Sequence, residues 1–264
     1  MDLQLTGKTV VVTGASRGIG LAVARAFAQE GAHVAAGART PGAELASLAE
    51  RYDVLPMAVD LATADGAAAL VDAAVTHFGT VDVLVNNVGA VTPRLGGFLS
   101  ITDEEWTRTF QINLLSAVRA SRAALPHLLE NRGAIVNIGS VNAVLPDPGI
   151  VDYAASKAAL ASFAKSLSKE VGPQGVRVNT ISPGPVETDI WLASGGMADT
   201  VAQAMGIERE AAREAIVTGL GGIATGRFTR PEEVADLALL LGSERSGNVT
   251  GSDFTIDGGL VKTL

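Results

Sequence analysis

The chain has 264 residues, of which 47% are hydrophobic and 18% are charged, and its formal net charge is −8. This composition is typical of a globular protein with a large buried core and does not suit a disordered chain. The acidic balance argues against a general nucleic-acid binder, because such proteins usually carry a basic surface. The sequence has no cysteine, which excludes disulfides, thiolate nucleophiles and cysteine-based metal sites.

The first residues, Met1-Asp2-Leu3-Gln4-Leu5, lack the basic and long apolar regions of a secretory signal peptide. No apolar run reaches the roughly 18 residues that a membrane-spanning helix needs. We therefore expect a cytoplasmic protein with neither membrane nor nucleic acid as a partner.

Short apolar runs alternate with helical patterns along the chain. This alternation predicts parallel strands joined by right-handed crossovers, with helices on both faces of the sheet. The predicted fold class is α/β: a single doubly wound, Rossmann-type domain over residues 1–264, with six or seven strands. The expected strands lie near 10–12, 34–36, 54–59, 81–85, 134–138, 176–181 and 253–256. The expected helices lie near 21–29, 43–51, 65–78, 103–130 and 150–171.

A glycine-rich loop, Thr13-Gly14-Ala15-Ser16-Arg17-Gly18-Ile19-Gly20, follows the first strand and opens the first helix. Glycines let the backbone turn tightly and approach a pyrophosphate, and the helix start offers free N–H groups and a positive dipole end. The spacing is Gly-x-x-x-Gly-x-Gly rather than the Gly-x-Gly-x-x-Gly of the general dinucleotide fingerprint. A plain turn is the alternative, so this loop alone is a weak signal.

The end of the second strand reads Ala36-Gly37-Ala38-Arg39-Thr40 and contains no acid. An acid at this place binds the ribose hydroxyl of NAD, whereas an arginine accommodates the 2′-phosphate of NADP. Arg39 therefore favours NADPH, and Arg17 could close on the same phosphate from the other side. The alternative is that both are solvated surface arginines.

Polar residues follow the third and fourth strands, at Asp60 and at Asn86-Asn87-Val88-Gly89. Asparagines at a strand end are often only turn formers. In a doubly wound sheet, however, the ligand lies at the carboxyl ends of the strands. Asp60 is accordingly a candidate for an adenine contact.

After Pro183-Gly184 the alternation breaks. Residues 185–226 are apolar and punctuated by glycines, and they include Trp191, Met197 and Met205. We expect one or two loosely anchored helices that form a lid over the site. A surface insertion or an oligomer contact is the alternative.

Tyr153 and Lys157 lie four residues apart in a helical stretch and share one face. A phenol with a pKa near ~10 is a poor acid–base catalyst at neutral pH, and a nearby ammonium favours its phenolate. Ser140 follows the strand near 134–138, and its hydroxyl could polarise a carbonyl that Tyr153 protonates. A Tyr-x-x-x-Lys pair alone is weak, because most such pairs are ordinary helix neighbours.

Together these motifs resemble those of the short-chain dehydrogenase/reductases, over nearly the whole chain and at the usual separations. The matching positions are Thr13-Gly14-x-x-x-Gly18-x-Gly20, Asn86-Asn87-x-Gly89, Asn113, Ser140, Tyr153, Lys157, Pro183-Gly184 and Asp257-Gly258-Gly259.

The resemblance implies a catalytic set in which Tyr153 is the acid/base and Ser140 orients the carbonyl. Lys157 would bind the nicotinamide ribose and lower the tyrosine pKa, and Asn113 would hold a water of the proton relay. Thr188 would contact the carboxamide. The full set of expected cofactor contacts is Gly14, Ser16, Arg17, Gly18, Ile19, Gly20, Arg39, Asp60, Leu61, Asn87, Gly89, Tyr153, Lys157, Pro183, Gly184, Val186 and Thr188.

One position departs from the family pattern: Val88 stands where alanine is usual. We expect valine to be tolerated because a nearby small residue can yield. The resemblance further implies a homotetramer built on paired long helices. The alanine-rich faces of 117–124 and 154–164 would allow close helix approach, although alanine is also simply a good helix former.

Other titratable residues carry weaker expectations. His33, His77 and His127 follow no metal-ligand spacing, so we expect them to be structural and the protein to hold no metal. Asp147 and Asp152 lie close to Tyr153 in sequence and are candidates for contact with polar groups of the substrate.

The leading prediction is an NADPH-dependent oxidoreductase that reduces a ketone or 3-oxoacyl-type carbonyl of a small molecule reversibly to a secondary alcohol. One alternative is an NAD-dependent alcohol dehydrogenase. A non-catalytic dinucleotide-binding sensor or scaffold is the alternative from another class, since a fold alone does not fix function.

Overall fold

A parallel sheet forms the centre of the molecule in the computed structural model, which describes residues 2–192, 196–219 and 222–263. The sheet has seven strands in the order β3-β2-β1-β4-β5-β6-β7, and all neighbouring strands run parallel. This confirms the predicted Rossmann-type α/β fold. The strands are β1 (Thr9–Thr13), β2 (His33–Ala38), β3 (Val54–Ala58), β4 (Val83–Asn86), β5 (Ala134–Ile138), β6 (Arg177–Pro183) and β7 (Asp253–Ile256).

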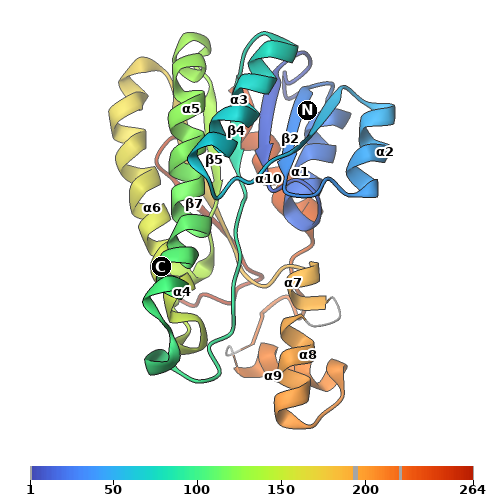
Figure 1. The fold of residues 1–264 in the computed structure, drawn as a ribbon, viewed down its shortest axis with the longest axis vertical. Coiled ribbons are helices and arrows are strands. Elements are labelled where there is room, and N and C mark those ends of the chain that lie inside the picture. The colour runs from blue at the N-terminus through green and yellow to red at the C-terminus, as the bar shows by residue number, and fades with distance from the viewer. Residues whose placement is uncertain (1, 193–195, 220–221, 264) are drawn as a thin grey trace.

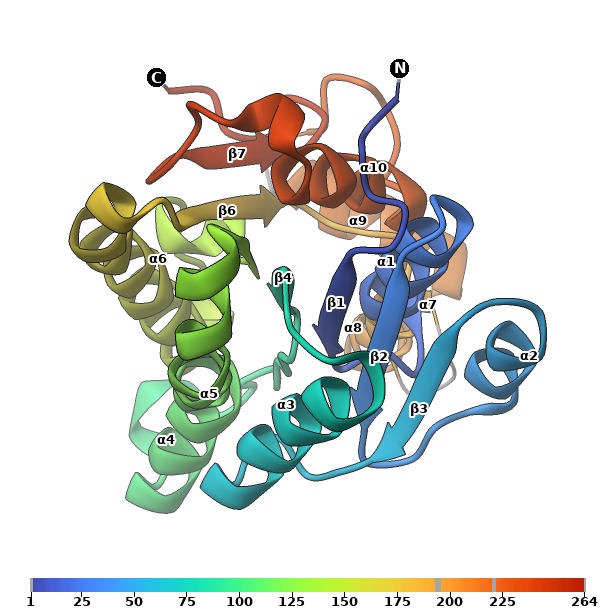
Figure 2. The same ribbon diagram turned by 90° about the horizontal axis from the view of Figure 1, so that it is seen from above.

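Helices cover both faces of the sheet (Figures 1 and 2). One face carries α1 (Gly18–Gln29), α2 (Ala43–Arg51) and α10 (Pro231–Gly242), and the other carries α3 (Ala64–Phe78), α5 (Ser116–Asn131) and α6 (Val151–Val171). Successive strand residues point to opposite faces, so Val10 and Val12 enter one buried cluster while Val11 enters the other. The sheet is therefore buried on both sides, as parallel sheets require.

Short one-turn elements join these units. They are η1 (Phe98–Ser100), η3 (Val141–Ala143), η4 (Pro148–Ile150), η5 (Gly172–Gln174) and η6 (Glu244–Ser246).

The long helix expected near 103–130 is interrupted. It consists of α4 (Asp103–Phe110), a π-helical turn (Gln111–Leu115) and α5. Thr102 and Glu105 form a reciprocal capping box at the start of α4, which explains the acidic residues there. π-turns are rare and occur often at functional sites, and this one contains Asn113.

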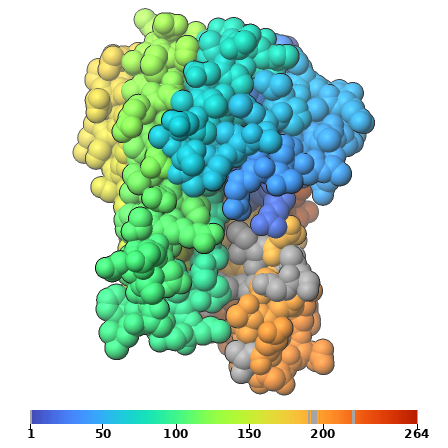
Figure 3. All heavy atoms as spheres, in the orientation of Figure 1, coloured from blue at the N-terminus to red at the C-terminus, as the bar shows by residue number. Residues whose placement is uncertain are grey.

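In its described part, the predicted lid, 185–226, contains three helices where one or two were expected. They are α7 (Asp189–Leu192), α8 (Met197–Met205) and α9 (Arg209–Gly219). Gly206 ends α8 in the left-handed conformation, with φ of 65°, so the apolar run is split into separate helices. Residues 193–195 and 220–221, and the side chain of Met197, lie outside the described residues. Figure 3 shows this segment projecting from the body of the molecule beside the green segment of α4.

An ion pair joins two parts of this segment, and aromatic contacts link it to Phe228, which follows it in the chain. Arg213 pairs with Glu187 at 3.2 Å, and its guanidinium lies 4.9 Å from the ring centroid of Phe228. Trp191 packs edge-on against the same phenylalanine ring, with centroids 5.4 Å apart. The segment is thus anchored through a few contacts rather than through a large core.

Part of the alanine-rich faces expected at a subunit interface is covered within the chain. Ala120, Ala124 and Ala164 are buried in the cluster that α3, α5 and α6 form on the sheet. They pack helices of one chain together, whereas Ala158 is exposed on α6 and Ala155 and Ala161 are half-buried, so the contact between subunits stays a prediction. The homotetramer itself stays a prediction.

The first two histidines make local contacts. His33 bonds the Asp53 carboxylate and stacks on Phe78, and His77 meets the edge of the same phenylalanine ring. Over 2–192, 196–219 and 222–263, no three histidine or carboxylate side chains are grouped so that they could hold a metal ion. Within the same ranges no helix is both long and apolar enough to cross a membrane.

Candidate active site

A cavity of 1690 Å³ opens at the carboxyl ends of the strands, where β1 is flanked by β2 on one side and β4 on the other. Pockets for a single small ligand usually measure about 300–1,000 Å³, so this cavity has room for a dinucleotide and a second molecule. All but one of the residues predicted to bind cofactor or act in catalysis line its wall. The exception is Asn113, whose buried side chain lies behind the wall.

The glycine loop forms one wall of the cavity. Gly14 and Gly18 have φ angles of 70° and 56°, in the left-handed region that favours glycine. A Cβ at Gly20 would lie 2.2 Å from the Gly14 carbonyl oxygen, so a larger residue cannot fit without a backbone shift. Arg17, the N-cap of α1, makes no side-chain cap, which leaves first-turn N–H groups for an anion. These features fit a pyrophosphate.

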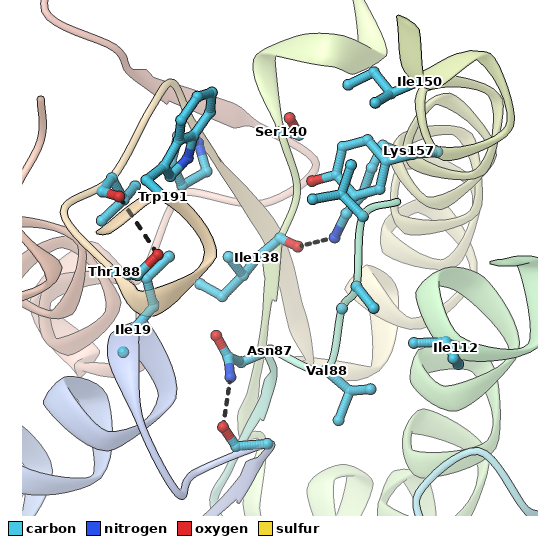
Figure 4. A pocket seen from close by; sticks show the side chains of 18 of the residues that line it. Ile19, Asn87, Val88, Ile112, Ile138, Ser140, Ile150, Lys157, Thr188 and Trp191 are labelled. Atoms are coloured by element: carbon cyan, nitrogen blue, oxygen red, sulfur yellow. Dashed lines mark hydrogen bonds between the residues drawn. The ribbon is translucent and has the colours of Figure 1, made fainter. Parts of the chain in front are cut away.

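Asn87 holds this loop in place from the end of β4. Its Nδ2 donates to the carbonyl oxygens of Thr13 and Gly14, each at 3.0 Å, and Figure 4 shows its amide turned towards the loop. Val88 packs beside it, since a Cβ at Gly14 would lie 3.3 Å from Val88 Cγ2. Gly14 is thus the small neighbour that makes room for valine at the position where alanine was expected.

The two arginines predicted to bind a phosphate both line the cavity. Arg17 also reaches the segment 185–226, because its Nη1 lies 3.4 Å from Asp189 Oδ2; the two side chains are 69% and 54% exposed. Such an exposed pair contributes little to stability and can be exchanged for another anion. No carboxylate among the described residues pairs with Arg39, at the end of β2.

Ser140 and Lys157 lie on the opposite side of the cavity from Ile19 and Thr188 (Figure 4), and Tyr153 lines the same cavity. Lys157 Nζ donates to the carbonyl oxygen of Ile138 at 2.9 Å and lies 5.8 Å from the Tyr153 ring centroid. The lysine is therefore held by β5 and reaches the cavity beside the tyrosine.

The pKa values of this group are set mainly by burial. Burial raises the pKa of Tyr153, and a hydrogen bond with Ser140 offsets only part of that effect. Burial lowers the pKa of Lys157 to about 8. Burial is the largest influence on this phenol, and the lowering of its pKa by Lys157 stays a prediction.

Asn142 was not predicted, although it lies two residues after Ser140 and lines the cavity. Ser140 Oγ donates to Asn142 Oδ1 and accepts from the Asn142 backbone N–H, both at 3.1 Å. This pair of bonds fixes the serine hydroxyl at the site. The only signal for Asn142 in the sequence was its position two residues after Ser140.

Asn113 uses its side chain to join two segments. Its Nδ2 donates to the carbonyl oxygens of Ala90 and Thr109 at 2.9 and 3.1 Å, and its Oδ1 accepts from the Ala90 N–H at 2.9 Å. The amide ties the loop after β4 to the π-turn. Its role in holding a water stays a prediction.

The far end of the cavity is mostly apolar, with a few polar groups. The apolar residues there are Val91, Pro93, Leu95, Leu145, Ile150, Trp191, Val201, Ile216 and Leu260. Asp147 lines the same region, and its Oδ1 accepts from the Gly149 N–H at 2.7 Å. The expected contact of Asp152 with substrate was wrong, because its buried carboxylate is covered by Arg94 and Thr109.

A doubly wound sheet with a glycine loop at its switch point, a serine after β5, and a tyrosine and a lysine on α6 in the same cavity is the arrangement of a Rossmann-type oxidoreductase. The chain belongs to the short-chain dehydrogenase/reductase family. A family model described as Enoyl-(Acyl carrier protein) reductase matches residues 14–261.

Similar proteins carry out several reactions. The chain is 37% identical to the 3-oxoacyl-[acyl-carrier-protein] reductase FabG of Thermotoga maritima, over 98% of this chain and 100% of that protein. It is 38% identical to 3beta-hydroxysteroid dehydrogenase 1 of Eggerthella lenta, over 97% and 95%. The crystal structure of L-sorbose reductase from Gluconobacter frateurii, complexed with NADPH and L-sorbose, is similar over 100% of both chains, with a TM-score of 0.92 and 36% identity.

Proposed function

We propose that this protein is an NADPH-dependent oxidoreductase that reduces a ketone or 3-oxoacyl-type carbonyl to a secondary alcohol, reversibly. The observation that carries the proposal is the meeting of Ser140, Tyr153 and Lys157 in the same cavity as the glycine loop. Relatives named as a 3-oxoacyl reductase, a hydroxysteroid dehydrogenase and a ketose reductase support a carbonyl–alcohol reaction.

The choice of NADPH rests on the end of β2. Arg39 lines the cavity there, no acid stands between Ala36 and Thr40, and Arg17 lines the cavity from the glycine loop. A 2′-phosphate offers two guanidinium groups a dianion for forked, charge-assisted hydrogen bonds. The L-sorbose reductase structure, which contains NADPH, supports this choice.

The remaining coenzyme contacts follow from the wall of the cavity. The glycine loop would hold the pyrophosphate, Asp60 and Leu61 the adenosine, and Thr188 the carboxamide. When bound, the nicotinamide supplies a hydride to the carbonyl carbon or accepts one from the alcohol. Lys157 would hold the ribose.

In the reduction, Tyr153 donates its phenolic proton to the carbonyl oxygen, while the Ser140 hydroxyl turns its hydrogen from Asn142 Oδ1 to the same oxygen. Because burial raises the pKa of Tyr153, the phenol is protonated at pH 7 and ready to act as the acid. The reverse reaction needs the phenolate as base, so its rate is expected to rise with pH. We further propose that segment 185–226 is the lid that selects the substrate and that the enzyme is a homotetramer.

The proposal is tested by following NADPH and NADH oxidation against a panel of carbonyls. The panel runs from small ketones through cyclic diketones and ketoses to 3-oxoacyl thioesters, with Tyr153→Phe as the control. We expect turnover that prefers NADPH and disappears in the variant.

A preference for NADH would reject the assignment of Arg17 and Arg39 and favour an NAD-dependent alcohol dehydrogenase. Tight coenzyme binding without turnover of any compound would favour a dinucleotide-binding sensor instead.

A further inference from the structure

An ionic cluster whose central pair is buried lies next to the catalytic tyrosine and has no part in the proposed chemistry. It consists of Arg94, Glu105, Thr109 and Asp152, and we call it the Arg94 cluster. Arg94 Nε donates to the two carboxylate oxygens of Asp152 at 3.3 and 3.2 Å, and its Nη2 donates to Oδ2 as well. The side chains of Arg94 and Asp152 are only 7% and 2% exposed.

The cluster joins three segments that meet beside the cavity. Arg94 belongs to the loop between β4 and η1, Asp152 starts α6, and α4 supplies the other two members. Arg94 Nη1 donates to Glu105 Oε1 at 2.7 Å, and Thr109 Oγ1 donates to Asp152 Oδ2 at 2.7 Å. The backbone N–H of Arg94 also donates to the carbonyl oxygen of Gly149 at 2.8 Å, just before α6.

Both ends of the ion pair are directly attached to the reaction site. Asp152 immediately precedes Tyr153 in α6. Pro93, Arg94 and Leu95 all line the cavity, and the Arg94 guanidinium is held there by Asp152 and Glu105. The Arg94–Asp152 fork therefore connects the substrate-facing loop 90–95 to the residue that bears the proton.

The ion pair is charged in the folded protein. Burial alone would raise the pKa of Asp152, but hydrogen bonds from Arg94 and Thr109 outweigh it and lower the pKa. A buried ion pair often adds little net stability compared with apolar side chains of similar size, and its best attested use is to fix one geometry. The cluster suits a role in placement better than a role in stability.

We infer that Arg94 is a positioning residue: through Asp152 it sets the distance between the substrate-facing loop 90–95 and Tyr153. This inference rests on the proposed carbonyl reduction. A small misplacement of a reacting group can cost about 100-fold in rate, so a loosened fork lowers the rate without touching the coenzyme. The glycine loop and Arg39 are not part of the cluster, and coenzyme binding is expected to be unaffected.

The first test removes the hydrogen bonds between Arg94 and Asp152 in the full-length protein. In Arg94→Met, kcat/KM for the best carbonyl substrate is expected to fall at least about tenfold. The dissociation constant of the preferred coenzyme stays within about twofold, because the proposed contacts to its phosphate groups lie at the other end of the cavity. Arg25→Met is the matched control, since Arg25 pairs with Glu44 on the surface at 3.3 Å and lies outside the cavity; it is expected to match the wild type.

A second variant distinguishes a role of the Arg94 cluster in positioning Tyr153 from a role in the stability of the fold. Arg94→Met leaves the Asp152 carboxylate buried without its cation, so a fall in Tm is expected. Adding Asp152→Leu removes that charge, and Tm is expected to recover while kcat/KM stays low. If kcat/KM returns to the wild-type value together with Tm, the cluster is only structural and the inference is wrong.

A third measurement needs no turnover. Amide hydrogen exchange in Arg94→Met is expected to speed up in residues 90–101 and 148–156, and to stay unchanged in residues 9–20. Unchanged exchange in both of the first two segments contradicts the inference. A wild-type protein that reduces no carbonyl would refute the proposed function, and the exchange experiment would then decide the inference by itself.

Discussion

The two ends of the cavity are built in different ways. At the coenzyme end the shape comes from the backbone: Gly14 and Gly18 adopt positive φ, and Gly20 has no room for a Cβ. At the substrate end the shape comes from side chains that meet across the fold, such as Arg94 and Asp152, which are 58 residues apart in sequence. A coenzyme can therefore be retained while substrate preference changes, because the two ends share few residues.

Of the variants considered, Tyr153→Phe is expected to show the largest effect on turnover with no effect on coenzyme binding. Loss of the proton donor is expected to lower kcat for carbonyl reduction by about 10²–10⁴-fold. The NADPH dissociation constant should stay within about twofold of the wild type, because the ring is retained. Steady-state kinetics and fluorescence titration measure the two quantities, and a variant with wild-type kcat would remove Tyr153 from the mechanism.

Gly20→Ala is expected to have the converse effect: it should weaken NADPH binding and leave the proton-transfer residues in place. The new Cβ would lie 2.2 Å from the Gly14 carbonyl oxygen, so the loop must shift away from the pyrophosphate. Overpacking of this kind costs about 1–3 kcal/mol, which corresponds to about a 5–150-fold weaker NADPH dissociation constant. Gly172→Ala is the control, because its Cβ would meet nothing within 4 Å; equal affinity of the two variants for NADPH would contradict this account of the loop.

Arg39→Ala tests coenzyme choice within the coenzyme end. Charge-assisted hydrogen bonds contribute about 1.5–3 kcal/mol, so the ratio of kcat/KM with NADPH to that with NADH should fall about 10–150-fold. The value with NADH should change little. Arg51→Ala, on the far end of α2, should leave the ratio as it is; a ratio unchanged in Arg39→Ala would show that the arginine lies in solvent.

The smallest expected effect is that of Lys157, beside Tyr153, on the free energy of unfolding of the protein. Lys157 has a pKa of about 8 in the fold against 10.5 in model compounds, so the unfolded chain binds the proton more tightly. Below pH 8 the buried charge destabilises the fold, and this penalty is lost as the pH rises from about 8 to 10.5. At pH 7 the free energy of unfolding of Lys157→Met should therefore be about 1–3 kcal/mol higher than that of the wild type. This range allows for the lost hydrogen bond to Ile138.

Thermal unfolding of wild type and Lys157→Met across pH 7–10.5 measures this difference. The gap between the two proteins should narrow as the pH rises. A gap that grows with pH would mean that the lysine is stabilised as the cation in the fold.

The contrast between the coenzyme end, built from local motifs, and the substrate end, built from side chains distant in sequence, explains what could be predicted from the sequence. The strand–glycine–helix pattern around Gly14 and the helical pair Tyr153 and Lys157 are local signals, and the structure brings these residues to one cavity. The order of elements followed from the alternation of apolar runs, because parallel strands need crossovers.

Other features carried no local signal. The π-turn at 111–115 contains Asn113, whose amide bonds Ala90, 23 residues earlier, and neither stretch indicates the other in the sequence. The burial of Asp152 depends on Arg94, and neither residue alone indicates the other. The net pKa of Tyr153 depends on the burial of its ring, which only the fold determines.

The central claim is that one end of the cavity binds the coenzyme and the other transfers the proton. It is tested most directly by measuring NADPH binding and carbonyl turnover on the same preparations of wild type, Tyr153→Phe and Gly20→Ala. We predict that Tyr153→Phe binds NADPH as the wild type does and fails to turn over, whereas Gly20→Ala binds weakly and regains turnover at high NADPH concentration. Loss of binding in Tyr153→Phe, or turnover without Tyr153, would contradict the account.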